Sequence, residues 1–180
     1  MKYLVISDIH GSKSSADAVK GLLELHGCSK ILSLGDVLYH GPRNDLPADY
    51  APKEVIALLN PLAELIIGVR GNCDAEVDQM VLKFDVHSDY HRIRCGKRLA
   101  YITHGHLDQS RLFPLVPGSI LLSGHTHIPV CEEKDGILFL NPGSMTLPKE
   151  NHPRSYGILE DNSFSVMKLE DHETHMRITF

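Results

Sequence analysis

The first seventy residues alternate between short apolar runs and longer segments whose apolar residues recur at helical spacing. The apolar runs have the length of buried strands and cover residues 3–6, 30–34 and 65–69. The segments between them predict helices over 12–26 and 52–60. We expect Ser14 or Ser15 to cap the first helix, and Gly27 to end it. Strand, helix and strand in succession predict a largely parallel sheet.

After about residue 85 the pattern changes to short segments of alternating character. Four of them, at 91–94, 99–102, 120–122 and 137–140, are separated by turns such as 95–97 and are expected to form hairpins of a second sheet. Three further strands are expected at 156–160, 164–169 and 174–180. The predicted fold class is α/β, with two mixed β-sheets packed face to face and flanked by helices, in a single domain over residues 1–180.

Side chains that bind metals gather in five glycine-containing turns, most of them directly after apolar runs. These side chains are Asp8, His10, Asp36, Asn72, His104, His125 and His127. Parallel strands deliver their carboxyl-end loops to one edge of a sheet, so we expect Asp8, Asp36 and Asn72 to meet in space. Two neighbouring divalent cations need several such ligands, one of them bridging, and Asp36 is the expected bridge. The chain is also rich in histidine, with 12 in 180 residues, which favours a metal site over coincidence.

Composition narrows the classes of partner. The formal net charge of -5 argues against a generic polyanion-binding surface, and no basic, aromatic-interleaved stripe supports nucleic acid as substrate, although a short duplex or single strand could still fit. No apolar run approaches the roughly 20 residues of a membrane-spanning helix, and Met1 leads straight into a strand-like segment. The four cysteines form no Cys-x-x-Cys pair, so reduced thiols are expected. We therefore expect a cytoplasmic protein without a membrane partner.

The order of the motifs resembles the calcineurin-like metallophosphoesterase superfamily. The motifs are D-x-H, G-D, G-N, H-G-H and G-H-T-H, and they span residues 8 to 127. Residues 35–44, 69–74 and 141–144 resemble, more narrowly, the small bacterial YfcE-type phosphodiesterases. The superfamily fold is a two-sheet α/β sandwich flanked by helices, which agrees with the pattern of strands and helices above.

The resemblance implies two metal sites that share one carboxylate. Asp8, His10, Asp36 and His127 would hold the first ion, and Asp36, Asn72, His104 and His125 the second. In an extended segment His125 and His127 would point the same way, toward two adjacent metals, and Thr126 would point away. Manganese is the expected metal, with zinc, iron, nickel and magnesium as alternatives that the oxygen and nitrogen ligands permit.

The expected mechanism is attack by a metal-bridging hydroxide on a phosphorus held by both metals, with no protein nucleophile. One residue departs from the superfamily pattern, because Cys73 stands where phosphoprotein phosphatases carry a histidine that protonates the leaving oxygen. A thiol is a poorer acid at neutral pH, so esters with good leaving groups are favoured. Asp74, which would orient that histidine, is retained, and His106 is a candidate substitute donor.

Substrate binding is assigned to four polar side chains: Asn72, Arg43, Arg70 and His106. The segment that includes His40, Arg43 and Asn44 either lines the substrate cleft or is a solvated loop. Arg70 either faces phosphate or covers the end of a strand.

Three classes of function remain. The favoured one is a metal-dependent phosphodiesterase with Asp36, Asn72, His106, Cys73 and Asp74 as catalytic candidates and a small-molecule phosphodiester as substrate. The alternatives are a phosphomonoesterase or phosphoprotein phosphatase, and a non-catalytic metal-binding scaffold of the same fold. The YfcE-type resemblance also implies a homodimer or homotetramer.

Overall fold

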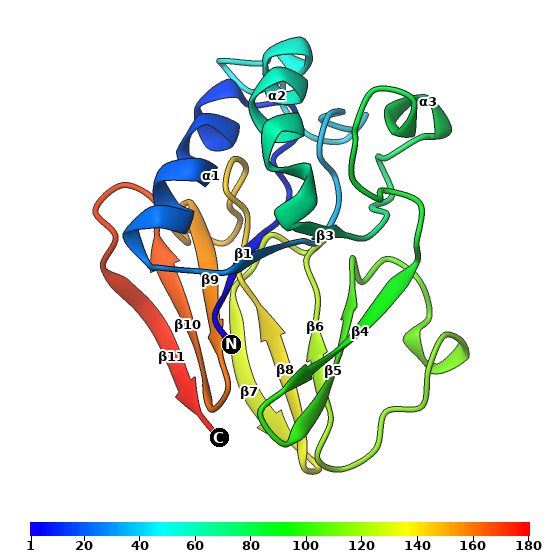
Figure 1. Ribbon diagram of the computed structural model, residues 1–180, viewed down its shortest axis with the longest axis vertical. Helices are drawn as coiled ribbons and strands as arrows, with labels where there is room; N and C mark the ends of the chain where they lie inside the picture. Colours follow the sequence, from blue (N-terminus) through cyan, green and yellow to red (C-terminus); the bar gives the residue numbers. More distant parts are fainter.

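Two β-sheets pack against each other in the computed structural model, which describes residues 1–180 (Figure 1). The six-stranded sheet contains, in spatial order, β11 (Thr174–Thr179), β10 (Ser163–Lys168), β9 (Ser155–Glu160), β1 (Tyr3–Ile6), β2 (Lys30–Ser33) and β3 (Ile66–Gly68). The five-stranded sheet contains β4 (Tyr90–Cys95), β5 (Arg98–Thr103), β6 (Ile120–Leu122), β8 (Ile137–Asn141) and β7 (Val130–Lys134). The predicted fold class is confirmed.

The strand directions confirm the parallel sheet predicted for the first part of the chain and correct part of the pairing predicted for the second sheet. β1, β2 and β3 are parallel, and β9 to β11 extend the same sheet in antiparallel fashion. In the other sheet β4–β5 and β7–β8 are hairpins, but β6 pairs parallel to both of its neighbours. The expected hairpin is thus present for segments 91–94 and 99–102, whereas segments 120–122 and 137–140 pair in parallel and not as a hairpin. The long connections before and after β6 are what a parallel pairing requires.

The helices cover one face of the six-stranded sheet, where α1 (Lys13–Leu25) and α2 (Pro52–Leu59) lie next to each other (Figure 1). Shorter helical segments are η1 (Asn60–Leu65), α3 (Glu76–Gln79) and η2 (Gln109–Arg111). Ser12, rather than Ser14 or Ser15, caps α1, because its hydroxyl accepts the N–H of Ser15. Gly27 ends the helix as expected, with a φ of +59°. None of the helices has the length and apolar character needed to cross a bilayer.

β1 is apolar throughout because both of its faces are buried. Leu4 and Ile6 pack in the layer beneath α1 and α2, whereas Tyr3 and Val5 pack in the layer between the two sheets. A strand covered on both sides shows no alternation of apolar and polar residues. The turn that follows β1 is therefore carried by a rigid, central element.

Substitution of Phe164 tests the apolar packing between the two sheets. Its fully buried ring lies over Gly157, where a Cβ would overlap the ring. Phe164→Ala is expected to lower the free energy of unfolding by about 3–5 kcal/mol, because the cavity removes both transfer energy and packing. Urea denaturation measures this loss, and Met80→Ala, at an 83% exposed residue, is the control with a change below about 0.5 kcal/mol. A loss below about 1 kcal/mol for Phe164→Ala would contradict the packing described here.

Candidate metal centre

The turns that follow β1 and β2 are joined by backbone hydrogen bonds. The N–H of His10 donates to the carbonyl of Asp36 at 2.9 Å, and the N–H of Gly11 donates to the carbonyl of Val37 at 2.9 Å. In the other sheet, the N–H of Gly124 donates to the carbonyl of His104 at 2.9 Å. Adjacent strands therefore bring the predicted side chains to one edge of the sandwich.

Most of the predicted metal ligands have an unusual backbone conformation. Positive φ angles of 49–67° occur at Asp8, His10, Asp36, His125 and His127. Non-glycine residues adopt this left-handed region at an energetic cost, although Asp and His tolerate it better than most. Such strain concentrates at functional sites, where the surrounding structure enforces it. The left-handed conformation turns these side chains inward from tight loops.

Three side chains converge on a point between β1 and the loop before β7. Asp8 Oδ1 lies 3.1 Å from His127 Nε2 and 3.6 Å from His10 Nε2, and the two Nε2 atoms are 3.2 Å apart. All three side chains are buried. Asp8 Oδ1 has no hydrogen-bond partner, whereas Oδ2 accepts from the Ser7 hydroxyl. The unpartnered oxygen and two imidazole nitrogens form a set of donors suited to a cation.

Asp36 lies between this group and a second one. Its Oδ2 is 3.7 Å from His10 Nε2 and 3.5 Å from His104 Nε2. On the far side, His104 Nε2 is 3.2 Å from Asn72 Oδ1. Ligand atoms at roughly 2.0–2.2 Å from one divalent ion lie about 3.0–3.6 Å from each other, which is close to the spacing in both groups. The residues present therefore fit divalent cations.

Backbone carbonyls orient the imidazole rings. His10, His104 and His127 each donate Nδ1–H to a carbonyl, at 2.8, 2.6 and 2.6 Å respectively. A carbonyl can only accept, so each ring directs Nε2 toward the carboxylates. This arrangement of an outer hydrogen bond on Nδ1 is the usual support for a histidine that binds a metal through Nε2.

The electrostatics describe a site that attracts positive charge. Burial raises the pKa of Asp8, but the His10 and His127 imidazoles outweigh burial and hold that pKa well below its ordinary value. The pKa of Asp36 is lowered in the same way, because His104 outweighs burial. Burial lowers the pKa of His104, but Asp36 and Asp8 outweigh burial and raise it to about 9. A divalent cation would replace the proton that these carboxylates hold on the ring.

His125 lies beside the second group, with its ring centroid 5.0 Å from that of His104. The extended conformation expected for residues 125–127 was wrong. His125 and His127 lie in a bend, with φ angles of 67° and 60°. Thr126, expected to point away, contributes to the wall of the pocket in front of the carboxylates. The bend is fixed by Asn141, whose side-chain amide donates to the carbonyl of Gly124 and to the Thr126 hydroxyl.

Asp74 supports the site from behind instead of facing it. Its carboxylate accepts the backbone N–H groups of Asp36, Val37 and Gly71, at 2.8, 2.9 and 2.7 Å. Burial and, to a lesser extent, the negative charge of Asp36 raise the pKa of Asp74 to about 6. Asp74 does not line the pocket in front of the carboxylates, so its predicted catalytic role gains no support from its position, which corresponds to holding the Asp36 loop.

Cys73 and His106, the two candidates for proton transfer, lie at different places. Cys73 lines the pocket, its N–H donates to Asp36 Oδ1 at 2.8 Å, and burial together with Asp36 raises the pKa of its thiol to about 12. The His106 ring lies 5.4 Å from that of His104, and its buried Nδ1 has no partner. Burial and the charge of His104 lower the pKa of His106 to about 4.

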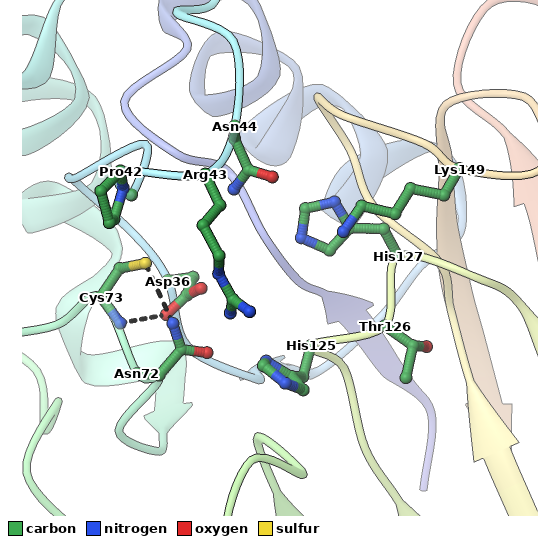
Figure 2. A pocket seen from close by; sticks show the side chains of 11 residues that line it. Asp36, Pro42, Arg43, Asn44, Asn72, Cys73, His125, Thr126, His127 and Lys149 are labelled. Atoms are coloured by element: carbon green, nitrogen blue, oxygen red, sulfur yellow. Dashed lines mark hydrogen bonds between the residues drawn. The ribbon is translucent and has the colours of Figure 1, made fainter.

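A pocket of about 310 Å³ opens in front of Asp36, Asn72, His125 and His127 (Figure 2). Its remaining lining residues are Gly41, Pro42, Arg43, Asn44, Cys73, Thr126 and Lys149. Arg43 and Asn44 thus take the first of the two positions left open for their segment, whereas His40 does not line the pocket. Arg70 is turned to Asp89, with an N–O distance of 2.6 Å, and does not line this pocket either. Its predicted role in substrate binding gains no support from this position.

Sequence reasoning missed two kinds of residue at this site. Lys149 lies in an irregular segment without a recognisable motif. Ser144 belongs to the turn at 141–144, which the resemblance included without assigning Ser144 a role, and its hydroxyl donates to the carbonyl of Asp8 at 2.9 Å. The Asn-Pro-Gly-Ser sequence was the available signal for this turn.

Known proteins resemble this chain over nearly all of its length. A family model described as the calcineurin-like phosphoesterase superfamily domain matches residues 1–163. A protein named phosphodiesterase YfcE from Escherichia coli (strain K12) is 44% identical over 172 residues, which are 95% of this chain and 94% of that protein. The solved structure of YfcE, described as a phosphoesterase from E. coli, has a TM-score of 0.94 and 42% identity, and covers 99% of both chains. Wild-type Vps29 from Entamoeba histolytica in complex with zinc has a TM-score of 0.65 and 26% identity, over 99% of both chains.

Gly71 offers a test of the site that changes none of the proposed ligand residues. A Cβ on Gly71 would overlap Asp36 Oδ1. Gly71→Ala is therefore expected to displace the Asp36 carboxylate and weaken metal binding by about 10-fold to 100-fold, the range for lost support of a ligand. Calorimetric titration with Mn²⁺ or Zn²⁺ measures the affinity, and circular dichroism verifies the fold.

The matched control is Gly21→Ala on the exposed face of α1, where a Cβ would meet no atom within 4 Å. This change is expected to leave metal affinity as it is and to stabilise the helix by up to about 1 kcal/mol. Equal metal affinity in the two variants would show that Asp36 does not bind metal in the position described.

Proposed function

The chain belongs to the calcineurin-like phosphoesterase superfamily and is a phosphoesterase, and from this premise we propose that it hydrolyses small phosphodiesters with the help of two divalent cations. The observation that carries the proposal is the position of Asp36, whose carboxylate lies between the His10 group and the His104 group. One carboxylate shared by two sets of donors is the arrangement that a dinuclear centre requires.

In this proposal Asp8, His10, Asp36 and His127 hold one ion, and Asp36, Asn72, His104 and His125 hold the other. Manganese remains the proposed metal, and zinc, iron, nickel and magnesium are compatible with oxygen and nitrogen donors. When bound, the cations would supply an activated water and neutralise charge on the phosphate. The zinc complex of the Entamoeba Vps29 supports zinc as the first alternative to test.

The residues of the chain have separate tasks around this centre. The side chains of Asn72 and His125 line the same pocket as Arg43 and Asn44, so they support placement of the phosphate within reach of the ligands. Asp74 and Ser144 hold the Asp36 and Asp8 turns and thereby fix the orientation of the carboxylates. No protein nucleophile is part of the proposal.

Proton donation to the leaving group is weak at this site. The thiol of Cys73, with a pKa of about 12, is a poor general acid at neutral pH. His106, with a pKa of about 4, is neutral at pH 7 and offers one N–H for a hydrogen bond to substrate. His106 is therefore a poor acid, and because it does not line the pocket its predicted contact with substrate stays a proposal that its position does not itself support. We favour diesters with good leaving groups over monoesters.

The non-catalytic scaffold is the less well supported alternative, because each predicted metal-ligand position carries a donor side chain. The expected cytoplasmic location and the expected homodimer or homotetramer stay predictions.

The first experiment compares bis-p-nitrophenyl phosphate with p-nitrophenyl phosphate. The protein is stripped of metal, and manganese, zinc, nickel or magnesium is then added. Turnover is expected only with added metal and at a higher kcat/KM for the diester. Asp36→Asn is expected to lower kcat/KM by at least about 10²-fold, because loss of a ligand exceeds loss of a ligand's support. Asp17→Asn, an exposed carboxylate on α1, is the matched control.

Preference for the monoester would overturn the diester assignment. Absence of turnover by protein that binds metal would favour the non-catalytic scaffold over the enzyme.

A second experiment separates the two roles of His106. Methyl p-nitrophenyl phosphate and methyl phenyl phosphate differ only in the leaving group. His106→Ala is expected to lower kcat/KM on both esters by the same factor, because a neutral imidazole that binds substrate acts on either ester alike. A loss of about 10²-fold or more confined to the phenyl ester would instead identify His106 as the general acid.

A further inference from the structure

Two cationic side chains reach the pocket from loops far apart in sequence. Arg43 lies in the loop after β2 and Lys149 in the loop before β9, and both are exposed. Figure 2 shows both side chains directed toward the space in front of Asp36 and His127. Neither takes part in an ion pair, in contrast to Arg70 outside the pocket, which binds Asp89.

A count of the charges at the proposed site leaves the positive charges of Arg43 and Lys149 without a negative partner. Two divalent ions would bring four positive charges, and the carboxylates of Asp8 and Asp36 cancel two of them. The negative charge of a simple diester and that of a hydroxide nucleophile cancel the other two. Arg43 and Lys149 then still carry two positive charges at the mouth of the pocket, although the chain as a whole carries -5.

The rest of the pocket is unsuited to an apolar or aromatic substrate group. Pro42 is the one apolar side chain in the lining, and no aromatic ring besides the histidines contributes to it. The nearby rings of Tyr39, His40 and Tyr50 pack against each other and not into the pocket. A nucleobase would therefore lack the stacking surface that such groups commonly use.

We propose that the physiological substrate carries, besides the scissile phosphodiester, a second anionic group that binds between Arg43 and Lys149. The second group is a carboxylate or a phosphoryl group, because both accept charge-assisted hydrogen bonds from a guanidinium and an ammonium. This inference rests on the proposed phosphodiesterase function and narrows its substrate class to small, multiply charged diesters.

The test uses p-nitrophenyl diesters that share one scissile bond and differ in the second alcohol. In the four diesters the second ester group is ethyl, 2-carboxyethyl, 2-phosphonoethyl or 2-(trimethylammonio)ethyl. At low ionic strength kcat/KM is expected to be about 10-fold higher for a diester with an added anion than for the ethyl diester, and lowest for the cationic one. The preference is expected to shrink in high salt, because exposed charges are screened. The better of the two anionic diesters identifies the chemical class.

Charge-removing variants assign the preference to residues. Lys149→Gln and Arg43→Gln are each expected to reduce the ratio of kcat/KM between the anionic and the ethyl diester by about threefold to fivefold, and the double variant to bring it close to one. Lys97→Gln, an exposed cation in the turn between β4 and β5, is the matched control and is expected to keep the full ratio. A ratio below about two in the unmodified protein, or a ratio that survives the double variant, would overturn the inference.

A binding measurement provides a readout without turnover. In calorimetric titrations of manganese-loaded protein, 2-carboxyethylphosphonate is expected to bind about 10-fold more tightly than propylphosphonate, and the double variant to bind both alike. Equal affinities in the unmodified protein would contradict the inference. If the ethyl diester is cleaved without any preference for added anions, the second-anion inference fails and the phosphodiesterase stands. If no diester is cleaved, the proposed function itself fails.

Discussion

The structure depends on keeping two carboxylates, Asp8 and Asp36, buried near each other in a polar centre. Like charges at such a place repel, and burial disfavours both, so the arrangement needs positive charge to be stable. The imidazoles supply part of that charge in the metal-free protein, which is why the pKa of His104 rises to about 9. The same fields that retain protons would retain divalent cations more strongly, so that metal binding would also stabilise the folded state.

The remaining structure supplies the rigidity that this centre needs. Parallel strands buried on both faces fix the ends of β1 and β2, and five of the proposed ligands adopt left-handed conformations that loops would not adopt unaided. Backbone groups do most of the fine positioning. Asp74 gathers three N–H groups behind Asp36, and Ser144 holds the carbonyl of Asp8. The support around the proposed ligands thus comes partly from the turn that also carries Asn72 and partly from the Ser144 turn, which carries no proposed ligand.

The sequence predicted the parts of this structure that have periodic or local signals. The strands β1 to β3 and both main helices were predictable, because apolar spacing reports burial directly. β7 was missed, since its sequence Val-Cys-Glu-Glu-Lys reads as a solvated segment and the strand lies at a sheet edge. The parallel pairing of β6 depends on tertiary contacts that short strands do not encode. The bend at His125 was misjudged because left-handed conformations of histidine have no sequence signature.

The rim of the pocket was the least predictable part, yet main-chain carbonyls connect it to two of the proposed metal ligands. Leu147, whose carbonyl accepts from His127 Nδ1, lies two residues before Lys149. Tyr39, whose carbonyl accepts from His10 Nδ1, lies four residues before Arg43. Both loops thus orient a proposed ligand through a main-chain carbonyl and present a side chain to the pocket. Because a carbonyl makes no demand on side-chain identity, such loops can change the charges at the pocket mouth while the metal centre keeps its geometry. Differences in substrate among proteins with this centre are then expected to reside in rim residues like these two and not in the ligands.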